Sequence, residues 1–310
     1  MRLLAAPLQG VTDCAWRHFH PFHYPESLDC YLTPFVRMEK GEPRGRDMRD
    51  VCSELNTGVA TVTQIIFSGP VEFGTLTEAL VKEGIRRIDL NIGCPFPLQV
   101  KRGRGAGMTE RIEVLAAVRR EMEQWIGDVE FSAKMRTGVN DSSRWEDLMD
   151  EVEKMPLQWV TIHPRTARQQ YGGEPDLDLF GRMAAATHHK VVYNGDVRTP
   201  ADFRAIMQRF PQIDGVMIGR GLCGRPSLAA EIESGREWTA EERLQRVMAL
   251  HTDMRSYYER TMCGETQIVG KLQAMWEYAE SEIGRKAWKA IRKANGLRGY
   301  DKAISLIGRG

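Results

Sequence analysis

Eight short apolar segments, rich in β-branched residues, alternate with segments of helical pattern between residues 3 and 218. The strand-like segments are 3–6, 31–36, 61–67, 87–92, 131–135, 159–162, 190–193 and 215–218. Helical patterns between them include 72–83, 111–124, 145–154 and 201–209. Such alternation predicts a parallel sheet, and eight repeats favour a closed (β/α)8 TIM barrel over an open doubly wound sheet. No Gly-x-Gly-x-x-Gly motif follows the first segment, which further argues against a Rossmann domain.

The pattern changes after about Gly235 to helices alone. Thr239-Ala-Glu-Glu242 has the form of a capping box, and apolar residues recur at helical spacing over 243–260. Two more helical stretches cover 267–283 and 286–294. We therefore expect a barrel domain over residues 1–235 and a small all-helical domain over residues 236–310.

Charge is distributed unevenly in a chain whose net charge is only +1. Seven basic residues and a single acid lie between 284 and 302, and smaller basic clusters lie at 40–49 and 101–104. Solvated helix faces give the same pattern. Three clusters in a nearly neutral chain nevertheless favour a partner with a phosphate backbone.

The cysteines and the apolar runs indicate the compartment. The six cysteines show no Cys-x-x-Cys spacing and no dense pattern, so they are expected to be thiols rather than zinc ligands or disulfides. No apolar run is long enough for a membrane span or a signal-peptide core. We expect a cytoplasmic protein without a membrane or protein partner, with a monomer as the simpler state. His18, His20 and His23 form a His-x-His-x-x-His run, but no carboxylate accompanies it at ligand spacing, and we predict no metal site.

Nearly every predicted strand carries polar or glycine-rich residues at or directly after its carboxyl end. In chain order they are Pro7-Leu8-Gln9, Gln64, Asn91 with Cys94, Lys134, His163, Asn194-Gly195-Asp196 and Gly219-Arg220-Gly221. Each has a simple structural explanation alone, for example a satisfied core histidine or a turn. In a barrel, however, the carboxyl ends of the strands meet at one rim, which is where ligands bind.

One anionic planar cofactor fits this set of residues. Lys134 could stabilise negative charge on a reduced flavin, and Gln64 and Asn91 could bond the ring edge. The glycine turns at 194–196 and 219–221 could hold one phosphate. This combination favours FMN over a dinucleotide.

The stretch from Arg87 to Pro95 delivers a thiol to the end of a strand. Gly93 permits backbone angles that other residues resist, and Pro95 fixes its own φ, so Cys94 would be held in one orientation. A buried cysteine without chemistry and a reactive one both fit this observation.

The ordered set of motifs resembles the tRNA-dihydrouridine synthases. The motifs are Ala6-Pro7, Gln64, Asn91-Ile-Gly-Cys94-Pro95, Val100 with 103–108, Lys134-Met-Arg136-Thr-Gly138, His163-Pro-Arg165-Thr166, Asn194-Gly-Asp196 and Gly219-Arg220-Gly221. The likeness covers the barrel to about Arg225 and continues weakly through 271–276. The start of the chain and segment 32–37 are similar to the bacterial C-type subgroup, which acts in the D-loop of tRNA.

The resemblance implies an FMN-dependent enzyme, reduced by NADPH or NADH, that saturates the C5–C6 bond of a uridine in tRNA. Reduced FMN would deliver hydride to C6, and Cys94 would donate a proton to C5. A thiol is mostly protonated at neutral pH, which suits that role. The FMN contacts implied are Pro7, Leu8, Gln9, Gln64, Asn91, Lys134, His163, Asn194, Gly195, Asp196, Gly219 and Arg220.

A flipped uridine needs a positive surface around the barrel mouth. The residues expected to contact tRNA are Arg37, Lys101, Arg102, Arg165, Lys271, Arg285, Lys286, Lys289, Arg292 and Lys293, with Arg165 nearest the base. The segment after Cys94 departs from the family pattern, since the spacing to Val100 is one residue longer and Gly107-Met108 replaces the usual ending. We expect this loop to close over the site.

Two other functions fit parts of the pattern. A barrel oxidoreductase similar to dihydroorotate dehydrogenases would act on a free pyrimidine, but it would not need a basic helical domain. A non-catalytic RNA-binding barrel would not need Gln64, Cys94 and Lys134 together with the two glycine turns.

Overall fold

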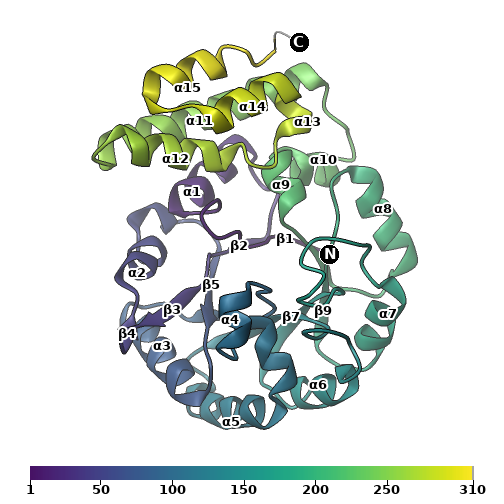
Figure 1. Ribbon diagram of the computed structural model, residues 1–310. Helices are drawn as coiled ribbons and strands as arrows, with labels where there is room; N and C mark the ends of the chain where they lie inside the picture. The colour runs from purple at the N-terminus through teal and green to yellow at the C-terminus, as the bar shows by residue number, and fades with distance from the viewer. Residues whose placement is uncertain (309–310) are drawn as a thin grey trace.

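The computed structural model describes residues 1–308, which form a closed parallel barrel ringed by helices and a stack of helices beside it (Figure 1). The strands are β1 (Arg2–Ala5), β2 (Cys30–Leu32), β3 (Val36–Glu39), β4 (Glu42–Pro43), β5 (Thr61–Ile66), β6 (Arg87–Ile92), β7 (Glu130–Arg136), β8 (Leu157–His163), β9 (Lys190–Asn194) and β10 (Gly215–Ile218). Their order is β2-β1-β10-β9-β8-β7-β6-β5-β3-β4, and pairing of β2 with β5 closes the barrel. The predicted TIM barrel is confirmed.

The prediction of one strand over 31–36 is wrong, because two short strands, β2 and β3, share this place in the barrel. Both pair in parallel with β5. Between them Pro34 has no N–H to donate, and the Thr33 hydroxyl accepts the backbone N–H of Gln64 at 3.1 Å. The chain resumes as β3 and folds back on β4 as an antiparallel hairpin.

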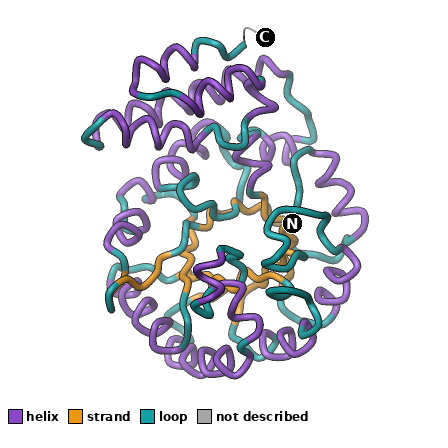
Figure 2. Tube along the Cα trace, viewed as in Figure 1, coloured by secondary structure: helices purple, strands orange, loops and turns teal. Residues whose placement is uncertain are grey.

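Helices follow the strands and form the outer ring (Figure 2). They are α1 (Cys14–His23), α2 (Gly45–Val51), α3 (Pro70–Lys82), α5 (Ile112–Met122), α6 (Trp145–Val152), α7 (Leu177–Ala185) and α8 (Pro200–Arg209). Shorter helical turns are η1 (Glu54–Asn56), α4 (Pro97–Lys101), η2 (Gly105–Glu110), η3 (Glu123–Trp125), α9 (Arg220–Gly224) and α10 (Leu228–Ser234). Thr199 and Asp202 close a capping box at the start of α8, with Pro200 at its first position.

The barrel interior divides into an apolar part and a polar part. Side chains from six strands form a buried apolar cluster: Leu4, Ala6, Cys30, Leu32, Val62, Trp159, Val192 and Met217. On the opposite side, β5, β6, β7 and β8 point polar side chains inward, among them Gln64, Asp89, Ser132 and Thr161, all nearly inaccessible to solvent. These polar groups lie directly beneath the carboxyl rim, because side chains two apart on a strand share a face.

The chain leaves the barrel at Gly235, which ends α10 with a φ of +66°. Five helices follow: α11 (Ala240–Thr261), α12 (Glu265–Met275), α13 (Glu280–Ile283), α14 (Arg285–Lys293) and α15 (Gly296–Ile304). The predicted single helix over 267–283 is therefore wrong, since the buried Trp276 ends α12 in a turn and its indole N–H donates to the Tyr300 hydroxyl. The sequence prediction also missed α15, whose glycines weaken its helical pattern.

The C-terminal helices pack on the side of the barrel formed by α1, α9 and α10 (Figure 1). Asp13 at the start of α1 accepts a hydrogen bond from the Tyr258 hydroxyl and forms an ion pair with Lys271. His23 bonds the Asp253 carboxylate at 2.7 Å. No helix within residues 1–308 is long and apolar enough to cross a membrane.

Each of the three histidines in α1 has its own hydrogen-bond partner. His18 bonds the carbonyl of Leu55, His20 bonds the Tyr31 hydroxyl and the Pro226 carbonyl, and His23 bonds Asp253. Because these partners lie in different directions, the run is explained by packing between α1 and its neighbours.

Candidate active site

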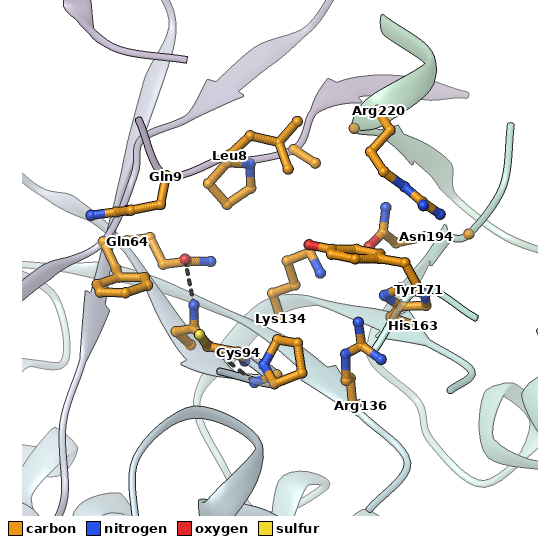
Figure 3. Close-up of a pocket in the computed structure, with 18 of the residues that line it drawn as sticks. Leu8, Gln9, Gln64, Cys94, Lys134, Arg136, His163, Tyr171, Asn194 and Arg220 are labelled. Carbon is orange, nitrogen blue, oxygen red and sulfur yellow. Dashed lines mark hydrogen bonds between the residues drawn. The ribbon is translucent and has the colours of Figure 1, made fainter. Parts of the chain in front are cut away.

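A cavity opens at the carboxyl end of the barrel, and side chains from most of the strands line it (Figure 3). The predicted residues that meet there are Pro7, Leu8, Gln9, Gln64, Asn91, Cys94, Lys134, His163, Asn194, Gly195, Asp196, Gly219 and Arg220. The structure thus brings together every residue that was predicted to hold a cofactor or to donate a proton. Their roles remain predictions.

The backbone at Cys94 is held by the side chain of Asn91. Asn91 Oδ1 accepts the backbone N–H of Cys94 at 2.8 Å and that of Gly93 at 3.1 Å. The Asn91 Nδ2 group donates to Gln64 Oε1 at 2.7 Å. The turn after β6 is therefore fixed by an amide that is itself fixed from the neighbouring strand.

The segment after Cys94 packs directly on it. The N–H of Ala106 donates to the Cys94 carbonyl at 3.1 Å. Gly105 has a φ of +58°, and a Cβ at this position would lie 2.8 Å from the Cβ of Cys94. Arg104, almost fully buried, anchors the same segment through an ion pair with Glu72. Only glycine fits at position 105.

Burial raises the pKa of the Cys94 thiol, and nearby Arg136 and Lys134 offset part of that rise. The thiol is therefore protonated at neutral pH. A protonated thiol can donate a proton, whereas a nucleophilic cysteine needs the thiolate. This chemistry agrees with the proton-donor role predicted for Cys94.

Lys134 projects from β7 into the cavity. Within the described chain its ammonium finds no hydrogen-bond acceptor, and burial together with the nearby Arg136 lowers its pKa to about 8. The group is still mostly charged at neutral pH. The Asp89 carboxylate offsets part of this fall in pKa but makes no hydrogen bond to the ammonium. A desolvated cation without a hydrogen-bonded acceptor is a site for an anionic ligand.

His163 ends β8 and is neutral, since burial and four surrounding cations hold its pKa well below the usual range. Arg165 Nη1 lies 3.3 Å from His163 Nε2. Because a guanidinium can only donate, Nε2 is the acceptor, which leaves the ring proton on Nδ1.

Asp196 lies between two arginines beneath the cavity. Arg165 Nη2 donates to Oδ2 at 2.7 Å, and Arg220 Nη2 donates to Oδ1 at 2.5 Å. These charges hold the Asp196 pKa below its usual range. The Arg165 side chain is fully buried and does not line the cavity, so it holds Asp196 in place rather than facing the opening.

Six residues of the cavity wall were not predicted as site residues. Three are neighbours in sequence of predicted ones, namely Ala6, Gly93 and Pro95, and the other three are Phe35, Arg136 and Tyr171. Arg136 could have been found, because it lies two residues after Lys134 on the same face of β7. Phe35 lies within the unpredicted break between β2 and β3. Tyr171 lies in the loop between β8 and α7, where no strand pattern places it.

The residues predicted to contact tRNA lie at several places outside the cavity. Arg37 and Arg102 both line a surface groove beside α4, and Lys101 is exposed on that helix. Lys271 pairs with Asp13 at the junction of barrel and helices. Arg285, Lys286, Lys289, Arg292 and Lys293 are all exposed on α14.

A closed parallel barrel with a cationic cavity at the carboxyl ends of its strands defines an enzyme of the (β/α)8 class. A solved structure of the old yellow enzyme from Trypanosoma cruzi shares this fold with a TM-score of 0.52, at 11% identity, over 80% of this chain and 93% of that one.

The sequence defines the family within that class. The family model described as "Dihydrouridine synthase (Dus)" matches residues 3–300, so the chain belongs to the dihydrouridine synthase family. A probable tRNA-dihydrouridine synthase from Staphylococcus aureus (strain COL) is 28% identical over 264 residues, covering 83% of this chain and 78% of the relative. tRNA-dihydrouridine synthase B from Escherichia coli (strain K12) is 30% identical over 237 residues, covering 75% of this chain and 71% of the relative.

Proposed function

We propose that this protein is a tRNA-dihydrouridine synthase, which reduces the C5–C6 bond of a uridine in tRNA. The observation that carries the proposal is a protonated thiol, Cys94, held at the rim of a cavity that also contains the unpartnered cation of Lys134. Both relatives described above are named as tRNA-dihydrouridine synthases, which supports a tRNA substrate. A uridine in the D-loop, as in the C-type subgroup, remains the predicted target.

The chemistry of the cavity wall fits FMN. Lys134, Arg136 and Arg220 supply positive charge, and the one carboxylate among the lining residues, Asp196, is already paired. Pro7, Leu8 and Phe35 add apolar surface against which a planar ring can pack. We assign the ring edge to Lys134, Gln64, Asn91 and His163, and the phosphate to the turns that contain Gly195 and Gly219 together with Arg220.

When bound and reduced by NADPH or NADH, this flavin supplies the hydride that reaches C6 of the uracil. Cys94 then gives its Sγ proton to C5, so that the double bond gains one hydride and one proton. The thiolate left on Cys94 regains its proton from solvent. Asn91 keeps the thiol in position throughout, and the charges of Lys134 and Arg136 stabilise negative charge that develops on the ring oxygens.

The surface around the cavity suits an RNA substrate. Phe96, which is 59% exposed, follows Cys94 and Pro95 directly and offers an aromatic face on which a base can stack. Lys101 and Arg102 extend from the same short helix, and the basic face of α14 lies on the appended helices. We propose that residues 1–235 bind the flavin, that the helices of 236–310 bind tRNA, and that the enzyme acts as a cytoplasmic monomer.

A reductase of a free pyrimidine is the second candidate, and the exposed basic face of α14 argues against it. A small substrate would need neither that face nor the exposed Phe96.

Mapping of dihydrouridine in tRNA from cells that lack this protein tests the proposal. We expect one position to lose dihydrouridine, with restoration by the wild-type gene and not by Cys94→Ala. Cys94→Ala should still bind FMN and be reduced by NADPH, since the thiol acts only in the step on tRNA. Restoration of dihydrouridine by Cys94→Ala at the wild-type rate would remove the proton-donor role, and an unchanged dihydrouridine map in the deleted strain would remove the function.

A further inference from the structure

Asp89 is a fully buried carboxylate with no part in the chemistry described so far. It lies on β6, two residues before Asn91, with an exposed fraction of 0%, and it does not line the cavity. Gln64 on β5 and Ser132 on β7 are its direct neighbours across the sheet. Gln64 Nε2 donates to Asp89 Oδ2 at 2.8 Å, and the Ser132 hydroxyl donates to Oδ1 at 2.7 Å.

These contacts form one continuous chain of hydrogen bonds, which runs from the barrel interior to the backbone at Cys94. Asp89 accepts from Gln64, Gln64 Oε1 accepts from Asn91 Nδ2, and Asn91 Oδ1 accepts from the backbone at Gly93 and Cys94. In Figure 3 a dashed line runs from the Gln64 side chain toward Cys94, and it marks the hydrogen bond that Asn91 Nδ2 donates to Gln64 Oε1. Every bond in this chain points toward Asp89.

The direction of the chain follows from its two ends. A backbone N–H can only donate, so Asn91 must turn its oxygen toward Cys94 and its amide nitrogen toward Gln64. Gln64 must then turn its own nitrogen inward, where it needs an acceptor. Asp89 supplies that acceptor, and burial, which raises its pKa to about 6, still leaves it a carboxylate at neutral pH. An amide can otherwise be turned over with little change in shape, so the acceptor decides its orientation.

The same orientation determines what the two amides offer to the cavity. The oxygens of Gln64 and Asn91 are both used inside the chain, while each nitrogen keeps one further hydrogen. Together with Lys134 and Arg136, this part of the wall therefore presents mainly donors, since Asn91 Oδ1 already accepts two bonds and Gln64 Oε1 accepts one. Such a wall matches the carbonyl edge of a flavin or of a uracil.

We propose that Asp89 is a positioning residue, whose carboxylate orients the amides of Gln64 and Asn91 and through them fixes the turn that holds Cys94. The kinetic part of this proposal rests on the proposed function, but the structural part does not. Without the acceptor, Gln64 would leave a buried N–H unpaired, and relaxation of that amide would release Asn91.

The test compares variants that break the chain of hydrogen bonds with variants that leave it intact. Asp89→Leu and Gln64→Met each remove one link. In Asp89→Asn the new amide keeps an oxygen that accepts from Gln64. Its amide nitrogen can donate to the Ser132 hydroxyl, which can turn to accept. Ser132→Ala removes a bond to Asp89 without touching the chain to Cys94.

Peptide-resolved alkylation of the purified full-length protein by iodoacetamide reports directly on the Cys94 thiol, with the exposed Cys52 as internal reference. We expect Cys94 to react at least fivefold faster in Asp89→Leu and in Gln64→Met, because its turn loosens. Asp89→Asn and Ser132→Ala should stay within twofold of the wild type. Cys94 in the double variant, which combines Asp89→Leu with Gln64→Met, should react no more than twofold faster than in either single variant, since both changes break the same chain of hydrogen bonds.

Stopped-flow measurements add a second readout. Oxidation of the reduced enzyme by tRNA should slow at least tenfold in Asp89→Leu, while reduction by NADPH should stay within threefold. A shift in Cys94 alkylation in a protein that makes no dihydrouridine would remove the proposed function and leave the positioning role intact.

Two results would overturn the proposal. The first is an Asp89→Leu protein that folds and whose Cys94 is alkylated at a rate within twofold of the wild-type rate. The second is an Asp89→Asn variant as perturbed as Asp89→Leu, which would show that charge and not hydrogen-bond direction matters. If Asp89→Leu does not fold, Gln64→Met decides the question by the same criterion.

Discussion

The guanidinium of Arg220 lies 4.3 Å from the centre of the Tyr171 ring and donates to Asp196 from the same group. Arg136 approaches the same ring at 5.6 Å. Two cations from opposite sides of the cavity thus hold the ring of Tyr171 at its mouth (Figure 3). The ring covers part of the proposed flavin site and is itself 43% exposed.

Removal of this ring should weaken cofactor binding. A cation–π contact contributes about 0.5–2 kcal/mol, so Tyr171→Ala should raise the Kd for FMN by about tenfold. Tyr171→Phe keeps the ring and should stay within about twofold of the wild type. Quenching of FMN fluorescence on titration with cofactor-free protein measures both values. Equal loss in the two variants would show that the hydroxyl matters and the ring does not.

The pKa of Lys134 sets the expected pH dependence. Its ammonium is charged below a pKa of about 8 and loses its charge as the pH rises through that value. The rate of flavin oxidation by tRNA should therefore fall above pH 8, before the Cys94 thiol ionises at its raised pKa. In Lys134→Arg, whose side chain stays charged, the decline should move to higher pH. A decline at the same pH in both proteins would assign it to another group.

The same residue should lower the stability of the cofactor-free protein. The pKa of Lys134 falls from 10.5 to about 8 on folding, so its charged form is disfavoured in the folded state below pH 8. Lys134→Met should raise the free energy of unfolding at pH 7 by about 3 kcal/mol, since a pKa that falls from 10.5 to about 8 costs ~1.4 kcal/mol for each pKa unit. The gain should shrink as the pH rises from 8 to 10.5. Urea denaturation at pH 7 and pH 10 measures this difference, and a loss of stability at pH 7 would contradict it.

Asp196 should act mainly through stability. It is the carboxylate paired with the fully buried Arg165, and removal of one partner of such a pair costs about 3–5 kcal/mol. We expect Asp196→Asn to lose stability in that range in urea denaturation at pH 7. The loss should diminish in acid, because the folded Asp196 carboxyl, with its lowered pKa, then becomes protonated. Asp178→Asn, which breaks an exposed pair with Arg209, serves as the control and should cost less than about 1 kcal/mol.

The exposed face of α14 should contribute to tRNA affinity through charge. Reversal of Arg285, Lys286 and Lys289 to glutamate should weaken tRNA binding at least about tenfold at low salt and flatten its dependence on salt concentration. The matched control reverses Lys82, Lys154 and Lys190, which are exposed at the opposite end of the barrel. FMN content should be unchanged in both proteins. Equal losses in the two triple variants would assign the effect to net charge alone.

The barrel could be predicted from sequence because its strands are buried on both faces and read as short apolar runs. Segments 87–92 and 215–218 match β6 and β10 at both ends. The prediction failed where local chemistry was decided by distant residues. Pro34 interrupts a strand that the apolar pattern runs through, and the turn at Trp276 depends on Tyr300, which follows much later in the chain.

The site was predictable to the extent that strand ends converge on one rim. Lys134 and His163 could be placed there because Lys134 lies near the carboxyl end of one recognisable strand and His163 ends another. Tyr171 could not, since a loop position follows from tertiary contacts with Arg136 and Arg220. The burial of Arg165 was also out of reach, because its partner Asp196 lies on another loop.

The contact between Gly105 and Cys94 determines how the loop between them can vary. Both ends of this segment are clamped, one by Asn91 and the other by Ala106 and Arg104. Any movement of residues 104–106 relative to Cys94 must therefore break the Ala106–Cys94 hydrogen bond or the Arg104–Glu72 ion pair, and closure of this loop over the site stays a prediction. We expect changes in the length of this segment to be accommodated in α4 (Pro97–Lys101), which lies between the two anchored ends. If α4 contacts RNA as proposed, insertions there should change which RNA binds and leave the contacts between Asn91 and the Cys94 backbone intact.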